Sequence, residues 1–199
     1  RPIVNADLHL ACRLAAGRVL LGQHRMTGKE TAPIDVPIVD FWLTADLQDP
    51  TPVTVRIREK TDKLIRQADV ICFPYGSFYS SLLANLLPQG VGDAVVAARC
   101  PKIYIPNLGH DPEQCGLSVA EQTARLLAAL ETGCVRSCRP EDLLRFVAVD
   151  SRGGRYDAPL DLAAVRRLGV EVLDLPLARD DNPAQADSRK VAELLLSLA

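Results

Sequence analysis

The chain has 199 residues, of which 48% are hydrophobic and 24% are charged, so it can bury a sizeable core as one globular domain. Its formal net charge is −2 and its Lys and Arg residues are scattered, which argues against a nucleic-acid-binding surface. No apolar run approaches the roughly 20 residues that span a bilayer. We therefore expect no nucleic-acid partner and no membrane partner.

The six cysteines bear on the compartment and on metal binding. They lie at irregular spacing in a chain that needs no disulfide staples, so a reduced, cytoplasmic protein is expected. Cys134 and Cys138 could supply two metal ligands, but no His lies near them in the sequence and a structural zinc takes four ligands. We predict no metal site in this chain.

Residues 1–60 predict a β-rich region. A Gly-containing turn at 15–18 separates two apolar segments, as in a β-hairpin, and a polar, Pro-bearing loop is expected over 27–37. Trp42 lies in an apolar run, where a buried core role is expected. The strands of this region are expected over 5–13, 19–24, 38–44 and 53–57.

From residue 61 the pattern alternates between helices and short apolar strands. Strands are expected over 70–73, 102–105, 145–149 and 170–173. Helices are expected over 61–67, from 77 to about 87, and over 92–99, 118–130, 162–168 and 182–198, with a short one at 140. Near-continuous apolar strands that alternate with helices indicate a parallel sheet covered on both faces. The predicted fold class is α/β, a Rossmann-like three-layer sandwich with a mostly parallel sheet and an N-terminal β-hairpin region.

Two helix starts carry specific capping signals. Ser118-Val119-Ala120-Glu121 has the Ser-x-x-Glu spacing of a capping box. Asn182 followed by Pro183 predicts a cap and first helical position for the terminal helix.

The main candidate site is the turn Pro74-Tyr75-Gly76-Ser77, which follows a buried strand and leads directly into a helix. Ligands of open α/β sheets collect outside the carboxyl ends of the strands, and a helix N-terminus favours phosphate. Gly76 lets a backbone approach an anion closely, and Ser77 offers a hydroxyl and an N–H group. The alternative is an ordinary strand-to-helix turn capped by Ser77.

A second polar loop, 106–116, follows the next strand. His110 and Asp111 in this loop are the candidates for an acid/base pair, and a solvated loop histidine is the alternative. Ser77 and Cys115 are weak candidates for a nucleophile, because no base lies near them in sequence and Gly-x-Ser-x-Gly is absent. The sequence therefore leaves the catalytic residues open.

The stretch Ala68–Pro88 contains Ala-Asp, then Gly-Ser-Phe-Tyr-Ser-Ser, then Asn-Leu-Leu. It resembles the Ala-Asp…Gly-Pro-Gly-Ser-Leu-Tyr-Thr-Ser…Asn-Leu-Leu signature of the CofD/YvcK superfamily. That superfamily includes 2-phospho-L-lactate transferases and YvcK-type gluconeogenesis factors. The resemblance continues into Pro101–Leu108, into the hairpin, and weakly into the terminal helix.

The resemblance implies a Rossmann-like sheet that binds a nucleotide diphosphate, a guanosine-type donor in the transferases or a UDP-sugar in the YvcK type. Ser80 would add a hydroxyl and an N–H group, and Tyr79 would pack on a base or sugar. The positions that match the nucleotide- or phosphate-binding motif are Gly76, Ser77, Tyr79, Ser80, Ser81 and Asn107.

This sequence departs from the family pattern in three places. Pro74-Tyr75 stands where the family has Gly-Pro, and 107–115 keeps only the Asn and Pro of the YvcK-type Asn-x-Met-Thr-Gln-Pro-Gly-Glu-Thr. The family's Gly-Gly-Gly-Thr-Gly phosphate loop and its acidic metal-binding residues have no counterpart here. The resemblance thus implies that 1–199 is the C-terminal part of a larger domain, with a β-rich region over 1–60 and alternating α/β over 61–199.

Three functions follow as hypotheses. The first is a transferase of the 2-phospho-L-lactate transferase type, with Mg²⁺ held by residues outside this chain. The second is a non-catalytic regulator that binds a UDP-sugar. The third is half of a shared interface, which associates with the missing N-terminal part or with a second copy.

Overall fold

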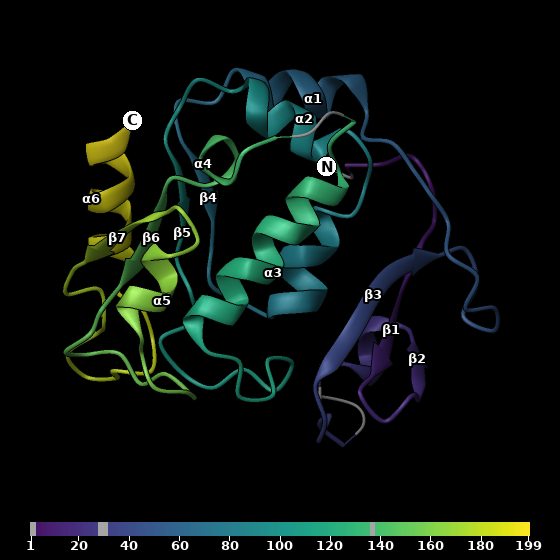
Figure 1. Ribbon diagram of the computed structural model, residues 1–199, viewed down its shortest axis with the longest axis horizontal. Helices are drawn as coiled ribbons and strands as arrows, with labels where there is room; N and C mark the ends of the chain where they lie inside the picture. The colour runs from purple at the N-terminus through teal and green to yellow at the C-terminus, as the bar shows by residue number, and fades with distance from the viewer. Residues whose placement is uncertain (1–2, 28–31, 136–137) are drawn as a thin grey trace.

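The computed structural model describes residues 3–27, 32–135 and 138–199, and it contains two β-sheets (Figure 1). A four-stranded sheet has the order β4-β5-β6-β7 and a three-stranded sheet has the order β2-β1-β3. The strands are β1 (His9–Leu14), β2 (Val19–Leu21), β3 (Ile38–Thr44), β4 (Ile71–Phe73), β5 (Lys102–Tyr104), β6 (Phe146–Val149) and β7 (Glu171–Asp174). The α-helices are α1 (Glu59–Arg66), α2 (Val91–Ala97), α3 (Val119–Thr132), α4 (Pro140–Leu143), α5 (Leu162–Arg166) and α6 (Ser188–Leu198).

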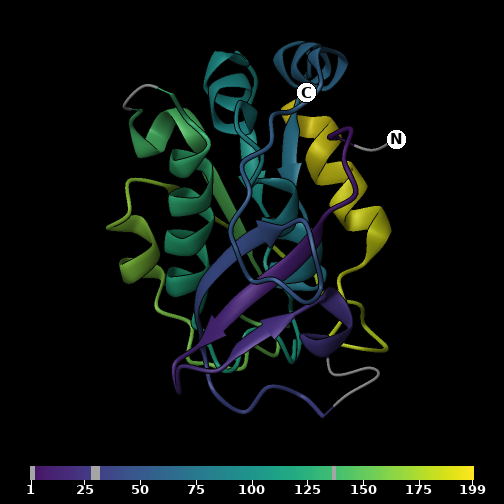
Figure 2. The ribbon, with the colours of Figure 1, turned by 90° about the vertical axis from the view of Figure 1, so that its right-hand side faces the viewer.

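The four-stranded sheet is parallel throughout and is covered by helices on both faces. Its central strands are apolar, and Ile103 and Val147 are fully buried. On one face, α6 packs through Val191 and Leu194 against a cluster that includes Ile103. On the other face, α2 and α3 lie over the sheet, as Figures 1 and 2 show. The prediction of a three-layer α/β fold with a mainly parallel sheet is confirmed.

The three-stranded sheet is antiparallel and forms the expected N-terminal hairpin region. Gly17 has a φ of +84° in the turn between β1 and β2, a backbone conformation that glycine adopts easily. Leu10, Cys12 and Leu14 of β1 belong to the same core cluster as Tyr79. The small sheet therefore shares its core with the segment that follows β4.

The structure differs from the sequence prediction at the expected strand 53–57 and at the start of the terminal helix. In both places the hydrogen bonds that form are not the ones that the sequence pattern indicates. Residues 53–57 form no strand but run extended beside other segments, held by bonds such as Ile57 N–H to Gln89 C=O at 3.0 Å. Pro50 and Pro52 remove N–H donors that a ladder needs. The terminal helix begins at Ser188, since Asp187 caps it by accepting from the Arg189 and Lys190 N–H groups. Asn182 instead accepts from the Ala184 N–H in a turn.

Smaller differences concern the start of α1, Trp42 and the loop before β3. Helix α1 starts at Glu59 rather than at Thr61. Trp42 is half-buried rather than buried, and its indole N–H donates to the Pro50 carbonyl at 2.7 Å. Part of the expected loop over 27–37, residues 28–31, lies outside the described residues. Over the described ranges, none of the helices has the length and apolarity that crossing a bilayer would require.

The capping box at the start of α3 is present as predicted and gives a test of the fold next to the site. The Ser118 hydroxyl accepts from the Glu121 N–H, and the Glu121 carboxylate accepts from the Ser118 N–H. We expect Ser118→Ala to lower the free energy of unfolding by about 1 kcal/mol in urea titrations. Ser188→Ala, one position inside a helix that Asp187 caps, is the matched control and should change it much less.

Candidate functional site at the carboxyl edge of the parallel sheet

The turn that follows β4 is exposed and tightly bent. Gly76 has a φ of +143°, and apart from Gly76 and its two chain neighbours no heavy atom of the described residues lies within 4 Å of the position a Cβ would take. Tyr75 is 38% exposed beside it. This turn leads into a single π-helical turn, Phe78–Leu82, in place of the expected α-helix, and a 3₁₀ turn follows over Leu83–Asn85. Isolated π-helical turns are frequent at functional sites.

The loop after β5 holds this turn through Asn107. The Asn107 side-chain oxygen accepts from the Gly76 N–H at 3.0 Å, and the side-chain NH₂ donates to the Gly76 carbonyl at 2.7 Å. Both backbone polar groups of Gly76 are therefore bound to one side chain. The structure thus brings together Gly76 and Asn107, which lie 31 positions apart in the sequence.

Two buried carboxylates of the same loop occupy the N-terminus of the π-helical turn. Asp111 accepts from the Phe78 N–H at 2.9 Å. Glu113 accepts from the Tyr79 and Ser80 N–H groups, both at 2.8 Å, and from the Ser80 hydroxyl at 2.5 Å. Bonds from backbone N–H groups to an ionised carboxylate are among the stronger hydrogen bonds. The protein's own side chains take the position at which a helix N-terminus elsewhere binds an anion.

Both carboxylates are buried, and burial changes the pKa of Asp111. Asp111 is 5% exposed and Glu113 is 1% exposed. Burial raises the pKa of Asp111 above its ordinary value of 3.8, while the bonds from the Phe78 and Glu113 N–H groups oppose that rise. The sequence analysis selected Asp111 for a different role and missed Glu113. A Glu in a polar loop, nine positions beyond the end of β5, gives no sign of its partners.

The expected nucleotide-binding residues divide into an exposed and a buried set. Tyr79 is 2% exposed, its ring packs edge-on against Phe41 and Phe78, and burial raises the pKa of its phenol to about 12. Ser80 is also buried. Both side chains therefore contribute to packing and hydrogen bonding in the interior, and Tyr79 also lines a cavity of about 300 Å³ together with Phe41 and Arg125. Gly76 and Ser81 are exposed, and Ser77 is half-buried.

The expected acid/base pair of His110 and Asp111 is not formed. The exposed His110 ring places Nδ1 2.9 Å from the carboxylate of Asp157, whereas Asp111 is directed inward to Phe78. Successive residues of an extended loop point in opposite directions, so sequence neighbours do not become partners. His110 instead links the loop after β5 to the loop after β6, and an acid/base role for His110 and Asp111 stays a prediction.

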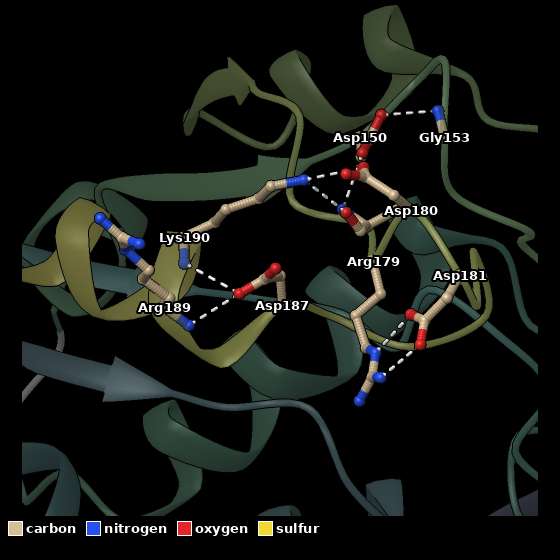
Figure 3. A network of polar contacts seen from close by, with 9 residues as sticks. Asp150, Gly153, Arg179, Asp180, Asp181, Asp187, Arg189 and Lys190 are labelled. Atoms are coloured by element: carbon tan, nitrogen blue, oxygen red, sulfur yellow. Dashed lines mark hydrogen bonds and ion pairs between the residues drawn. The ribbon is translucent and has the colours of Figure 1, made fainter.

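A further buried carboxylate, Asp150, joins the loops after β6 and β7 (Figure 3). It accepts from the Gly153 N–H at 2.6 Å and from the Ala178 N–H at 2.9 Å. Lys190 of α6 donates to the Ala178 carbonyl and lies 3.4 Å from Asp180. The sequence analysis missed this network. An Asp shortly before two glycines at the end of a predicted strand was the available signal.

The described residues do not fit a metal centre. Nowhere in 3–27, 32–135 or 138–199 do three or more His, Cys, Asp or Glu side chains gather in a way that could hold a metal ion. The two carboxylates nearest the turn already accept backbone N–H bonds. The sulfurs of Cys134 and Cys138 lie 3.1 Å apart, and they are two of the chain's free thiols.

The fold and the site define a class of protein. A parallel α/β sheet carries polar loops at its carboxyl edge, the place where such sheets bind nucleotides and other ligands. The family model for the 2-phospho-L-lactate transferase CofD matches residues 1–187. The chain therefore belongs to the CofD family, within the CofD/YvcK superfamily.

The curated relatives described here are named gluconeogenesis factors rather than 2-phospho-L-lactate transferases. The chain is 28% identical over 206 residues to the gluconeogenesis factor of Bacillus subtilis (strain 168), a match that covers 99% of this chain and 60% of the relative. It is 37% identical over 86 residues to a putative gluconeogenesis factor of Thermotoga maritima, covering 40% of this chain and 27% of the relative. The chain thus spans less than two thirds of the length of these relatives.

Solved structures agree with the fold. A crystal structure of protein BH3568 from Bacillus halodurans superposes with a TM-score of 0.76 at 20% identity, over 98% of this chain and 60% of that one. A second structure of the same protein, described as a member of the UPF0052 family, gives a TM-score of 0.77. At this identity the likeness shows the fold alone.

Replacing Glu113 tests whether its carboxylate holds the π-helical turn. Glu113→Gln keeps the size and an oxygen for the Tyr79 and Ser80 N–H groups, but it removes the negative charge that strengthens the three bonds, so we expect the free energy of unfolding to fall by about 1–3 kcal/mol. Glu131→Gln, on the exposed side of α3, is the control. Equal effects of the two substitutions in urea titrations would show that the bonds to Glu113 do not stabilise the fold.

The pH dependence of stability tests the burial of Asp111. Because its pKa is raised on folding, the folded state binds the proton more tightly than the unfolded state does. The contribution of Asp111 to stability is then greatest below 3.8 and falls as the pH rises through the higher folded value. We expect the stability of the wild type relative to Asp111→Asn to decrease with rising pH in denaturant titrations from about pH 3 to pH 7. A difference that stays constant over this range would contradict the shift.

Proposed function

We propose that this chain binds a nucleoside diphosphate or nucleotide-sugar at the carboxyl edge of its parallel sheet, as a regulator of the gluconeogenesis-factor type. The single observation that carries the proposal is the Gly76 turn, held open to solvent by Asn107, Asp111 and Glu113. A turn fixed before the ligand arrives loses little entropy when it binds. The names of the curated relatives support the regulatory role.

The exposed part of the site offers donors for a phosphate or a sugar hydroxyl. Ser81 presents its hydroxyl at the surface, and the open space beside Gly76 admits a ligand close to the backbone. Tyr75 provides an exposed ring on which a base could stack. Positive charge is available on the loop after β6, where Arg155 is exposed and its N–H donates to the Leu108 carbonyl at 2.6 Å.

A transferase is the second candidate, and the match to the CofD model favours it. It would move a phosphoester-linked group from a nucleotide diphosphate, with Mg²⁺ held by residues beyond those described here. The residues that would transfer protons in this reaction are not assigned, because the candidate His110 pairs with Asp157 rather than with Asp111. Incubation of the complete protein with GTP- or UDP-linked donors and 2-phospholactate separates the two: product formation supports the transferase, and binding without turnover supports the regulator.

The thiols bear on where the proposed protein acts. The cysteines are free, and burial raises the pKa of the Cys12 and Cys72 thiols to about 11. Unpaired thiols in a protein of this size are typical of a reducing compartment. We propose a cytoplasmic protein on this basis.

Ligand binding is tested by thermal melting. We expect GDP or a UDP-sugar to raise the melting temperature of the protein by several degrees at ligand concentrations about 100-fold above Kd. Gly76→Val should abolish the shift, because the new side chain fills the open space beside the turn.

Gly17→Val is the matched control, since Gly17 also has a positive φ and open space around it but lies in the hairpin. No shift with any nucleotide, or an equal shift in Gly76→Val and wild type, would remove the turn as the binding site.

A further inference from the structure

Two cysteines that follow α3 lie close enough to react with each other. The sulfurs of Cys134 and Cys138 are 3.1 Å apart, and the Cys138 thiol donates to the Cys134 sulfur. A disulfide bond joins its sulfurs at about 2.05 Å, so a shift of about 1 Å would bring these two to bonding distance. Both residues are half-buried, and neither is sealed in the core.

The surrounding backbone fixes the position of the Cys134 sulfur. The Cys134 thiol donates to the Leu130 carbonyl at 3.4 Å. Gly92 of α2 lies against the same sulfur, since a Cβ at Gly92 would come within 2.6 Å of it. Helix α2 therefore approaches Cys134 through a residue without a side chain. Cys138 is the reactive group that remains beside the sulfur.

The pair lies at the opposite edge of the parallel sheet from the Gly76 turn. Helix α3 runs from the carboxyl end of β5 back toward the amino end of β6, so Cys134 lies at the amino edge (Figure 1). There the Asp93 carboxylate of α2 accepts from the Val135 N–H at 3.1 Å. Helix α4 begins two residues after Cys138 and contacts α2 and α3. A bond between the cysteines would tie the end of α3 to the start of α4.

We propose that Cys134 and Cys138 form a reversible redox site, a dithiol that is oxidised to an intramolecular disulfide by exchange with a low-molecular-weight disulfide such as oxidised glutathione. In a reducing compartment, protein disulfides are usually transient and either catalytic or redox-sensing. The free thiols of the structure are then the reduced state of this pair.

The exchange conserves atoms and electrons over two steps. The Cys138 thiolate attacks one sulfur of oxidised glutathione, forms a mixed disulfide and releases one glutathione thiolate. The Cys134 thiolate then attacks the Cys138 sulfur, so the bond between the two cysteines forms and the second glutathione leaves as a thiolate. The two glutathione thiolates take up the two protons that the cysteines lose, and two electrons pass from the protein to glutathione.

The surroundings of Cys134 assign the order of the two attacks. Burial raises the pKa of the Cys134 thiol from its ordinary value of 9.0 to about 12, and its bond to Cys138 and the charge of Cys138 add to the rise. Because the thiolate is the nucleophile, Cys138 attacks first while Cys134 keeps its proton. The contribution of Cys138 to the rise ends once its sulfur is in the mixed disulfide, which favours ionisation of Cys134 for the second step.

Peptide mapping identifies the bond. Trypsin cleaves after Arg136, between the two cysteines, so a disulfide would join two peptides that otherwise separate. The folded protein is incubated with oxidised glutathione, and the remaining thiols are blocked with iodoacetamide before digestion. We expect a linked pair of peptides, lighter by two hydrogen atoms than the two thiol peptides together. Treatment with dithiothreitol should abolish the linked pair.

Single substitutions separate the roles of the two cysteines. Cys134→Ser allows the first step alone, so the glutathione adduct on Cys138 should exceed that of the wild type at least about tenfold. Cys138→Ser leaves the protonated Cys134 and should carry less adduct than Cys134→Ser does. Cys100→Ser is the matched control, because Cys100 is another half-buried free cysteine, and it should give the linked peptides as the wild type does.

Thermal melting tests whether the native positions of the two cysteines allow the bond. A cross-link reduces the conformational entropy of the unfolded chain, so we expect the oxidised wild type to melt a few degrees above the reduced wild type. Cys134→Ser should show no such difference. A lower melting temperature after oxidation would contradict the proposal, because the bond would then strain the fold.

Three further results would overturn the proposal. The first is the absence of linked peptides from folded wild type in oxidised glutathione. The second is linked peptides found only in a dimer on a non-reducing gel, because the bond then joins two copies. The third is equal adduct on Cys134→Ser and Cys138→Ser, which would overturn the assigned order of attack. Nucleotide binding at Gly76 enters none of these measurements, so this proposal and the proposed function can fail separately.

Discussion

The candidate site depends on the bonds from Asp111 and Glu113 to the start of the π-helical turn. A buried carboxylate destabilises a fold unless hydrogen-bond donors surround it, and free N–H groups at a helix start are costly when buried. Here the two carboxylates accept from the Phe78, Tyr79 and Ser80 N–H groups, so neither the carboxylates nor these N–H groups are buried without a partner. The loops after β4 and β5 therefore form together, and the shape of the Gly76 turn follows from their joint structure.

This arrangement changes how the motif of the CofD family is interpreted in this chain. The Gly-Ser-x-Tyr-Ser-Ser pattern suggests a row of backbone donors for a phosphate, but three of those donors are bound internally. In the proposed function, the groups that remain for a ligand are the exposed Gly76 turn and Ser81. Tyr75, which stands where the family has a proline, then lies at the surface that a ligand would meet.

Strand β4 leads directly into the candidate site. Its carboxyl end carries the Gly76 turn, and its free edge, opposite β5 in the described sheet, faces an apolar groove of about 470 Å³. The small sheet of β1–β3 contributes to the same region, since Phe41 packs against Tyr79. The site thus lies where the two sheets and the open edge meet.

The sequence by itself determined the class of fold and the two loops that matter. Apolar runs separated by helical spacing fix which segments become strands and helices, and the Ser118–Glu121 capping box is a local signal that needs no tertiary partner. A second local signal was wrong: Asn182 accepts from the Ala184 N–H in a turn, and Asp187 caps the terminal helix instead.

Only the tertiary structure decided what the site residues do. Hydrogen bonds join residues that lie 31 to 47 positions apart in the sequence. The pairs are Glu113 with Ser80, Asn107 with Gly76, and His110 with Asp157. Such pairs depend on which strand ends become neighbours and on the direction of each side chain. Local spacing in the sequence specifies neither the neighbouring strand ends nor the side-chain direction, because the side chain of a loop residue can point inward or outward with the same sequence neighbours.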